Sequence, residues 1–77
     1  KGYPNPYDYE FSLQMESSSD ARVSIKVYDM VGKLIDTREV QPMDVPTVSI
    51  GSRYPSGVYN VVVSQGEHTQ TLRMVKR

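Results

Sequence analysis

The 77 residues are enough for one small domain, and nine basic against nine acidic side chains leave it without net charge. No run of Lys and Arg interleaves with aromatic residues, which excludes nucleic acid and an anionic membrane surface as expected partners. No cysteine is present, so disulfides and thiolate metal sites are excluded, and packing of apolar side chains must stabilise the fold.

Residues 1–9 are predicted to form an extended lead-in that follows a linker, with Lys1 and Gly2 as the end of that linker. Pro4 and Pro6 exclude a helix, because each proline lacks a backbone donor and forces the preceding residue into extended geometry. The remaining residues, 10–77, are predicted to form one β-sandwich, so the whole chain is a single domain.

The first strand is predicted over residues 10–17, where Phe11, Leu13 and Met15 alternate with polar residues. The polar cluster at residues 17–20 breaks it, since such side chains hydrogen-bond their own backbone in loops. Alternation returns at residues 23–28, where Val, Ile and Val occupy every second position. This is the strongest period-two pattern in the chain.

A hairpin is predicted next. Asp29 suits the first position of a turn and Gly32 can take a positive φ, so residues 33–40 return antiparallel, with a bulge. Two prolines make residues 41–46 a connection that can cross between sheets. A short strand is predicted over residues 48–50, and the turn at residues 54–57 leads into the final hairpin.

The final hairpin pairs residues 58–64 with residues 68–76 around a turn at residues 65–67. The first arm is apolar on both sides, which predicts a strand inside a sheet with layers on both faces. The second arm has one wet face, because Leu72 and Met74 alternate with Thr71 and Arg73. We expect the end of this arm to be accessible to a partner.

Together these patterns predict six or seven strands, and no stretch shows helical periodicity. Turn signals recur about every 8 to 12 residues, which is typical of an all-β fold. The predicted architecture is an antiparallel immunoglobulin-like β-sandwich, with an open barrel as the alternative.

Catalytic and metal chemistry is not indicated. His68 is the one histidine and is expected in or beside a turn, without clustered carboxylates for a metal site. The pairs Asp8 with Glu10 and Asp36 with Glu39 lack a second base or an aromatic cleft, and the serines at 17–19 lack a general base. We predict that the domain is not an enzyme and binds no cofactor.

Four pieces of sequence, in order, resemble the C-terminal sorting domain of cargo proteins of the type IX (Por) secretion system of Bacteroidota. They are Tyr3-Pro4-Asn5-Pro6 with Phe11 and Leu13, then residues 23–33, residues 57–63 and residues 71–76. Each motif alone is weak, but the ordered set covers nearly the whole chain. The departure is at Tyr54-Pro55, where a leucine before the Ser-Gly turn is more usual in the family.

The resemblance implies an immunoglobulin-like secretion address behind a passenger domain in the same chain. It implies transit through the periplasm, recognition by the outer-membrane translocon, and a final place on the cell surface or outside the cell. In the family, a sortase-like cell-surface cysteine protease usually removes the domain, and the passenger is joined to anionic lipopolysaccharide. The cut implied here lies near or before Lys1.

We expect a translocon to recognise the domain by strand addition to the second arm of the hairpin. The predicted recognition residues are Thr69, Thr71, Arg73, Met74, Val75 and Lys76, with Gly57 and Tyr59 fixing the hairpin that presents them. The alternative for Arg73 and Lys76 is that their charges block unwanted pairing at a sheet edge.

Two other functions stay open on the sequence alone. A carbohydrate-binding module would use Tyr3, Tyr7 and Tyr9 as an exposed stacking platform, and an immunoglobulin-like spacer would need no recognition site. The apolar residues 58–63 and the segment 42–46 also predict that isolated copies pair as a strand-swapped homodimer.

Overall fold

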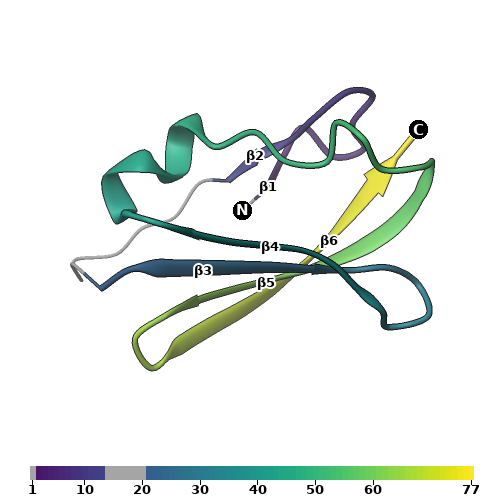
Figure 1. Cartoon of the computed structure of the whole chain (residues 1–77). Helices are drawn as coiled ribbons and strands as arrows, with labels where there is room; N and C mark the ends of the chain where they lie inside the picture. The colour runs from purple at the N-terminus through teal and green to yellow at the C-terminus, as the bar shows by residue number, and fades with distance from the viewer. Residues whose placement is uncertain (1, 14–20) are drawn as a thin grey trace.

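The computed structural model describes residues 2–13 and 21–77 (Figure 1). This part of the chain forms six strands and one short 3-10 helix. They are β1 (Gly2–Tyr3), β2 (Ser12–Leu13), β3 (Val23–Tyr28), β4 (Leu34–Val40), the 3-10 helix η1 (Pro42–Thr47), β5 (Gly57–Gln65) and β6 (His68–Lys76). The predicted all-β class is confirmed.

The strands form two antiparallel sheets. The large sheet has the order β4-β3-β5-β6, and the small sheet pairs β1 with β2. The small sheet, η1 and the chain that follows η1 lie over one face of the large sheet, which gives the layered, immunoglobulin-like arrangement predicted from the sequence (Figure 1).

The final hairpin is confirmed and is slightly longer than predicted. β5 and β6 pair along their full nine residues, from Gly57 with Lys76 to Gln65 with His68. Gly66, at φ +60°, supplies the left-handed conformation that the turn requires. β5 also pairs with β3, so it is the interior strand that its apolar composition predicts.

The hairpin of β3 and β4 is confirmed as well. Asp29 Oδ1 accepts hydrogen bonds from Val31 N at 3.0 Å and Lys33 N at 2.9 Å, and Gly32 takes φ +87°. The register shifts between Val27 and Tyr28, which is the predicted bulge. The turn therefore holds its shape through the aspartate side chain.

The core lies between the two sheets and is built from alternate residues. The large sheet contributes the inward side chains of three strands, and the small layer contributes residues from the first third of the chain and from the segment after β4. The buried residues are Tyr7, Phe11, Leu13, Val23, Ile25, Val27, Val45, Ile50, Tyr59, Val61, Val63 and Met74.

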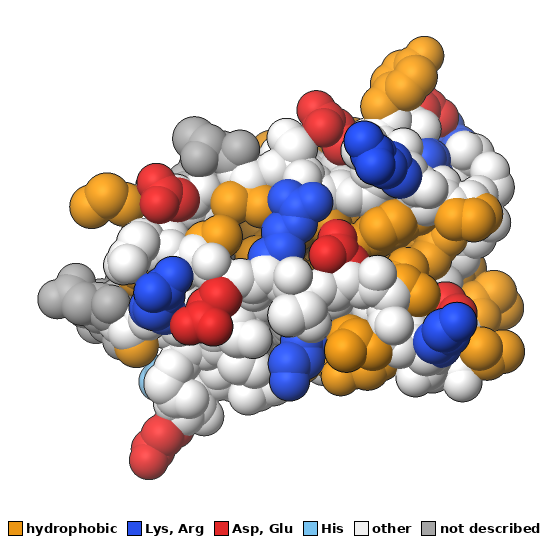
Figure 2. All heavy atoms as spheres, in the orientation of Figure 1, with side chains coloured by type: hydrophobic (Ala, Val, Ile, Leu, Met, Phe, Trp, Pro, Cys, Tyr) orange, Lys and Arg blue, Asp and Glu red, His pale blue; other side chains and the backbone are white. Residues whose placement is uncertain are grey.

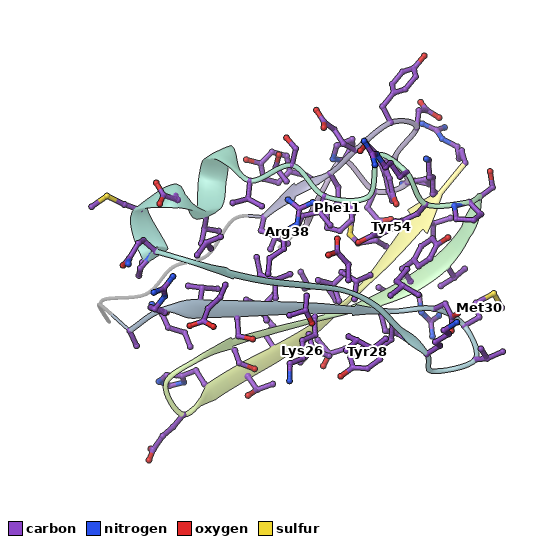
Figure 3. All side chains as sticks on the ribbon, viewed as in Figure 1. Phe11, Lys26, Tyr28, Met30, Arg38 and Tyr54 are labelled. Atoms are coloured by element: carbon purple, nitrogen blue, oxygen red, sulfur yellow. The ribbon has the colours of Figure 1, made fainter. Side chains whose placement is uncertain are left out.

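One expectation for β5 is wrong. Its second face, with Val58 and Val62, carries no covering layer in the described residues, and both valines are only half-buried. The neighbouring strands explain this: Val62 is flanked by Lys26 of β3 and Thr71 of β6, whose side chains shield it within the same face. In Figure 3, Lys26 and Tyr28 point away from the small layer, along this outer face.

The segment after β4 also differs from the prediction. Residues 42–47 form η1, and Val48 N donates to Val45 O at 3.2 Å, so Val48 ends the helix. The short strand predicted over residues 48–50 is reduced to one bridge between Ile50 and Phe11. Of the strand predicted over residues 10–17, Ser12 and Leu13 form β2, Phe11 forms the isolated bridge, and Glu10 is outside any strand. Residues 14–17 of that prediction and the loop predicted at residues 17–20 lie outside the described residues.

Large apolar side chains are exposed at one end of the sandwich. Met30 and Val31 are 74% and 87% exposed at the tip of the β3–β4 turn, and Leu34 beside them is 47% exposed. Figure 2 shows apolar side chains gathered at the end of the molecule where this turn lies.

Candidate functional site

β6 is one of the two edge strands of the large sheet, β4 being the other, and the backbone groups of β6 alternate between two directions. Gln65 and His68 are paired across the two-residue turn, so they exchange hydrogen bonds, and every second residue from His68 onward bonds β5. The backbone N–H and C=O of Thr69, Thr71, Arg73 and Val75 therefore point outward, away from the sheet.

Residues Asn5–Asp8, here called the strap, cover the last part of this edge. The Asn5 side chain acts as a peptide group: Val75 N donates to Asn5 Oδ1 at 3.0 Å, and Asn5 Nδ2 donates to Arg73 O at 2.9 Å. Tyr7 N then donates to Val75 O at 2.8 Å, and Arg77 N donates to Tyr7 O at 2.9 Å. The strap thus adds a short parallel bridge to β6.

The ring of Tyr7 anchors the strap in the core. Its exposed fraction is 0%, it meets Phe11 edge-on at 5.0 Å between ring centroids, and its hydroxyl donates to Gly51 O at 3.3 Å. Outside the core, Arg77 forms an ion pair with Asp8 at 3.0 Å. Within the predicted lead-in, residues 4–6 and 8–9 are bends on either side of the Tyr7 bridge, and the segment packs as part of the sandwich.

The first part of the edge is uncovered. The outward N–H groups of Thr69, Thr71 and Arg73 and the C=O groups of Thr69 and Thr71 have no backbone partner in the described part of the chain. These five groups, here called the open edge, form a straight template, because β6 pairs with β5 without a bulge. Such an edge accepts another extended chain.

The predicted recognition residues divide into two groups. The side chains of Thr69, Thr71 and Arg73 are exposed along the open edge. The side chain of Met74 is 1% exposed and packs in the core, so the folded domain does not present it to a partner, and its role in recognition stays a prediction. Val75 is half-buried. Lys76 is also half-buried, and its Nζ donates to Ser52 O at 3.2 Å and Tyr54 O at 2.7 Å.

Gly57 and Tyr59 lie at the end of the hairpin opposite its turn, where they pair with Lys76 and Met74. The Tyr59 hydroxyl donates to Pro55 O, and its ring lies 5.0 Å from that of Tyr54. These contacts of Tyr59 hold the chain where it enters β5, and the predicted role of Gly57 and Tyr59 in presenting the hairpin stays a prediction.

The whole chain, residues 1–77, matches the family described as the secretion system C-terminal sorting domain. The chain belongs to this family. No match was found among curated proteins or among solved structures. The family provides the sorting signal of type IX secretion, so the resemblance noted in the sequence is confirmed.

The carbohydrate-binding alternative is not favoured for this sorting domain. Of the three tyrosines expected to form an exposed platform, Tyr3 and Tyr9 are exposed but Tyr7 is fully buried. The spacer alternative is not favoured either, because the family is defined by a sorting role. A sorting signal directs a protein to its destination and is not itself a catalytic site.

Asn5 is the residue of this site that the sequence reasoning missed. Its position between two prolines indicated only an extended segment. The available signal was its side chain, since an amide carries the same donor and acceptor as a peptide bond and can continue a ladder where proline cannot.

A polar cluster connects the two layers of the sorting domain on the side of β4. Tyr54 O–H donates to Asp36 Oδ2 at 2.8 Å, and Arg38 lies 3.6 Å from the same oxygen and donates to Ser49 O at 2.9 Å. Figure 3 shows Arg38 reaching from β4 toward the small layer. These bonds fasten the large sheet to the segment after η1.

Burial raises the pKa of three tyrosines. Desolvation raises the pKa of Tyr7 to about 12, and it also raises the pKa of Tyr59. The pKa of Tyr54 is raised by desolvation and further by its hydrogen bond to Asp36. In each case the fold favours the neutral phenol.

We therefore expect the domain to lose stability as the pH rises above about 10, the pKa of an unfolded tyrosine. A raised folded-state pKa stabilises the fold fully below the unfolded pKa, and that stabilisation is lost as the pH rises through the folded value, about 12 for Tyr7. Urea unfolding at a series of pH values between 8 and 12 measures this loss of stability. Tyr7→Phe should flatten part of the decline, and an unchanged slope would contradict the assignment.

The described residues contain neither a candidate metal site nor a helix that could span a membrane. Within them, no group of three His, Asp or Glu side chains is placed to hold a metal ion. His68 is exposed at the start of β6. Over residues 2–13 and 21–77, no helix has the length and apolarity needed to cross a bilayer.

Proposed function

We propose that the exposed outer row of β6, Thr69, Thr71 and Arg73, is the part of this type IX sorting signal that the translocon recognises. The observation that supports it is the division of β6: the strap covers the edge from the Arg73 carbonyl onward, and the first part stays open. Val75 and Lys76 contribute by holding the strap and the Ser52–Tyr54 turn.

We infer the wider route from the family. The domain accompanies a passenger in the same chain through the periplasm to the outer-membrane translocon, which delivers it to the cell surface or beyond. A sortase-like protease then cuts before the folded domain. The small sheet supports a cut on that side, because Gly2 of β1 already pairs with Leu13 of β2.

We infer that the domain itself catalyses no reaction. Three of the four carboxylates in the two candidate pairs are engaged in the fold: Asp8 is paired with Arg77, Asp36 accepts from Tyr54, and Glu39 is paired with Arg22. Any catalysis belongs to the passenger.

The test is a reporter protein joined ahead of residues 1–77 in a bacterium with a type IX system. Arg73→Ala should lower surface delivery by roughly tenfold, the loss expected when a charged group loses its hydrogen-bonded partner. Arg53→Ala, an exposed arginine in the other layer, is the matched control and should leave delivery unchanged. Equal delivery by both variants, with unchanged unfolding midpoints, would contradict the proposed role of Arg73.

A further inference from the structure

We propose that the open edge binds an extended polypeptide segment of a partner by strand addition, and that this segment places an acidic side chain beside Arg73 and an apolar one beside Leu72. The proposal deepens the proposed function by giving the chemistry of the partner. Its structural basis, an unpaired edge of defined length, does not depend on the route of secretion.

The backbone determines the kind of partner. Five outward groups over Thr69–Arg73 are unpaired in the described residues, and they follow the spacing of a regular ladder. Three of the devices that protect a sheet edge are missing there: residues 69–73 contain no proline and no lysine, and the pairing shows no bulge, and Arg73 is the one charged residue of this stretch. An extended chain is the ligand whose donors and acceptors match this pattern.

The side chains determine the sequence of the partner segment. On the outer face, Arg73 is exposed and has no ion pair in the described residues, and its paired neighbour on β5 is the neutral Asn60. Lys26 adds a second exposed cation on the same face. A carboxylate on the added strand, next to Arg73, meets complementary charge.

The face of the added strand that lies on the core side of the sheet requires an apolar side chain. Leu72 is half-buried at the margin of the core, beside the edge. An apolar side chain next to Leu72 would extend the core over it. Because side chains of a strand alternate between faces, the partner segment should alternate apolar and acidic residues.

Asn5 determines where the added strand ends. Its amide already occupies Arg73 O and Val75 N, so an incoming strand meets the strap at Arg73. Removing the Asn5 side chain would free both groups and lengthen the edge. The strap thereby sets both the register and the length of the binding site.

The experiment uses residues 1–77 in solution and two hexapeptides, one alternating glutamate with valine and one alternating lysine with valine. We expect the glutamate peptide to slow amide hydrogen exchange at Thr69, Thr71 and Arg73 by roughly tenfold. The lysine peptide should bind about three- to tenfold more weakly. Protection of other residues only, or equal affinity for both peptides, would overturn the proposal.

Three variants complete the test. Thr71→Pro removes one outward N–H at a position where an edge strand tolerates proline, and it should abolish peptide protection, whereas Thr71→Val should retain it. Asn5→Ala should extend the protected stretch to Val75, a gain that unfolding does not produce. If the three variants bind the peptide alike, the edge is not the site.

Two further results separate this inference from its alternatives. A wild-type reporter fusion that is not exported would refute the proposed function, while peptide protection at the open edge would still support strand addition. If light scattering detects a dimer that Thr71→Pro abolishes, the proposal of a partner segment with acidic residues would be overturned. Such a dimer would assign the edge to a second copy, through edge pairing and not through the predicted strand swap.

Discussion

Tyr7→Ala is expected to lower the free energy of unfolding by roughly 3–5 kcal/mol, the usual cost of truncating a large buried aromatic side chain. The ring is fully buried against Phe11, and its hydroxyl bonds Gly51 O. Domains of this kind are stable by about 5–15 kcal/mol, and a small one lies near the lower limit. The variant is therefore expected to be largely unfolded at 37 °C.

Urea unfolding followed by circular dichroism measures this effect. Tyr9→Ala is the matched control, because Tyr9 is 83% exposed and its removal should change stability by less than about 0.5 kcal/mol. Tyr7→Phe isolates the hydroxyl and should cost roughly 0.5–1.5 kcal/mol. Similar losses for Tyr7→Ala and Tyr9→Ala would mean that the strap is not anchored in the core.

Gly51→Ala is expected to cost roughly 2–4 kcal/mol, from two separate causes. Gly51 has φ +89°, where an added Cβ costs about 1 kcal/mol. The added Cβ would also lie 2.5 Å from the Tyr7 hydroxyl oxygen and 3.1 Å from the Phe11 ring. Relieving that overlap in a packed core costs about 1–3 kcal/mol more.

Gly32→Ala separates the two causes. Gly32 has nearly the same φ, +87°, but an added Cβ there meets nothing within 4 Å. Its cost should be ~1 kcal/mol, the conformational part alone. The difference between the two midpoints in urea then measures the crowding at Tyr7. Equal losses of unfolding free energy in the two variants would show that the core relaxes around this ring without cost.

The two predictions concern the same structural unit. The strap reaches the edge of β6 through its backbone and the core through Tyr7, and Gly51 makes room for the Tyr7 hydroxyl. A change at Gly51 should therefore disturb the far end of β6. The N–H groups of Val75 and Arg77 donate hydrogen bonds to the strap, so amide exchange at these two residues reports that coupling.

Local patterns were sufficient to predict much of the fold. Alternation at residues 23–28 and 68–76 places Val27 and Met74 on the buried side and Thr71 on the exposed side. Asp29 and Gly32 determine their turn through contacts within five residues of chain. Such features depend on the period of a strand and on the chemistry of neighbouring residues, both of which the sequence states directly.

Contacts between distant residues were not predictable in this way. Asn5 and Val75 are separated by 70 positions, and Tyr7 enters the core only because β6 and the turn at Gly51 approach it from other parts of the chain. No local pattern distinguishes Tyr7, which is buried, from Tyr9, which is exposed.

The sequence by itself determined that the chain is a β-sandwich and a sorting domain, because both follow from the period of its strands and the order of its motifs. Only the tertiary structure decided how much of β6 a partner can reach. That depends on which backbone groups the strap already satisfies, and a hydrogen bond has a direction and a partner in space that residue order does not specify.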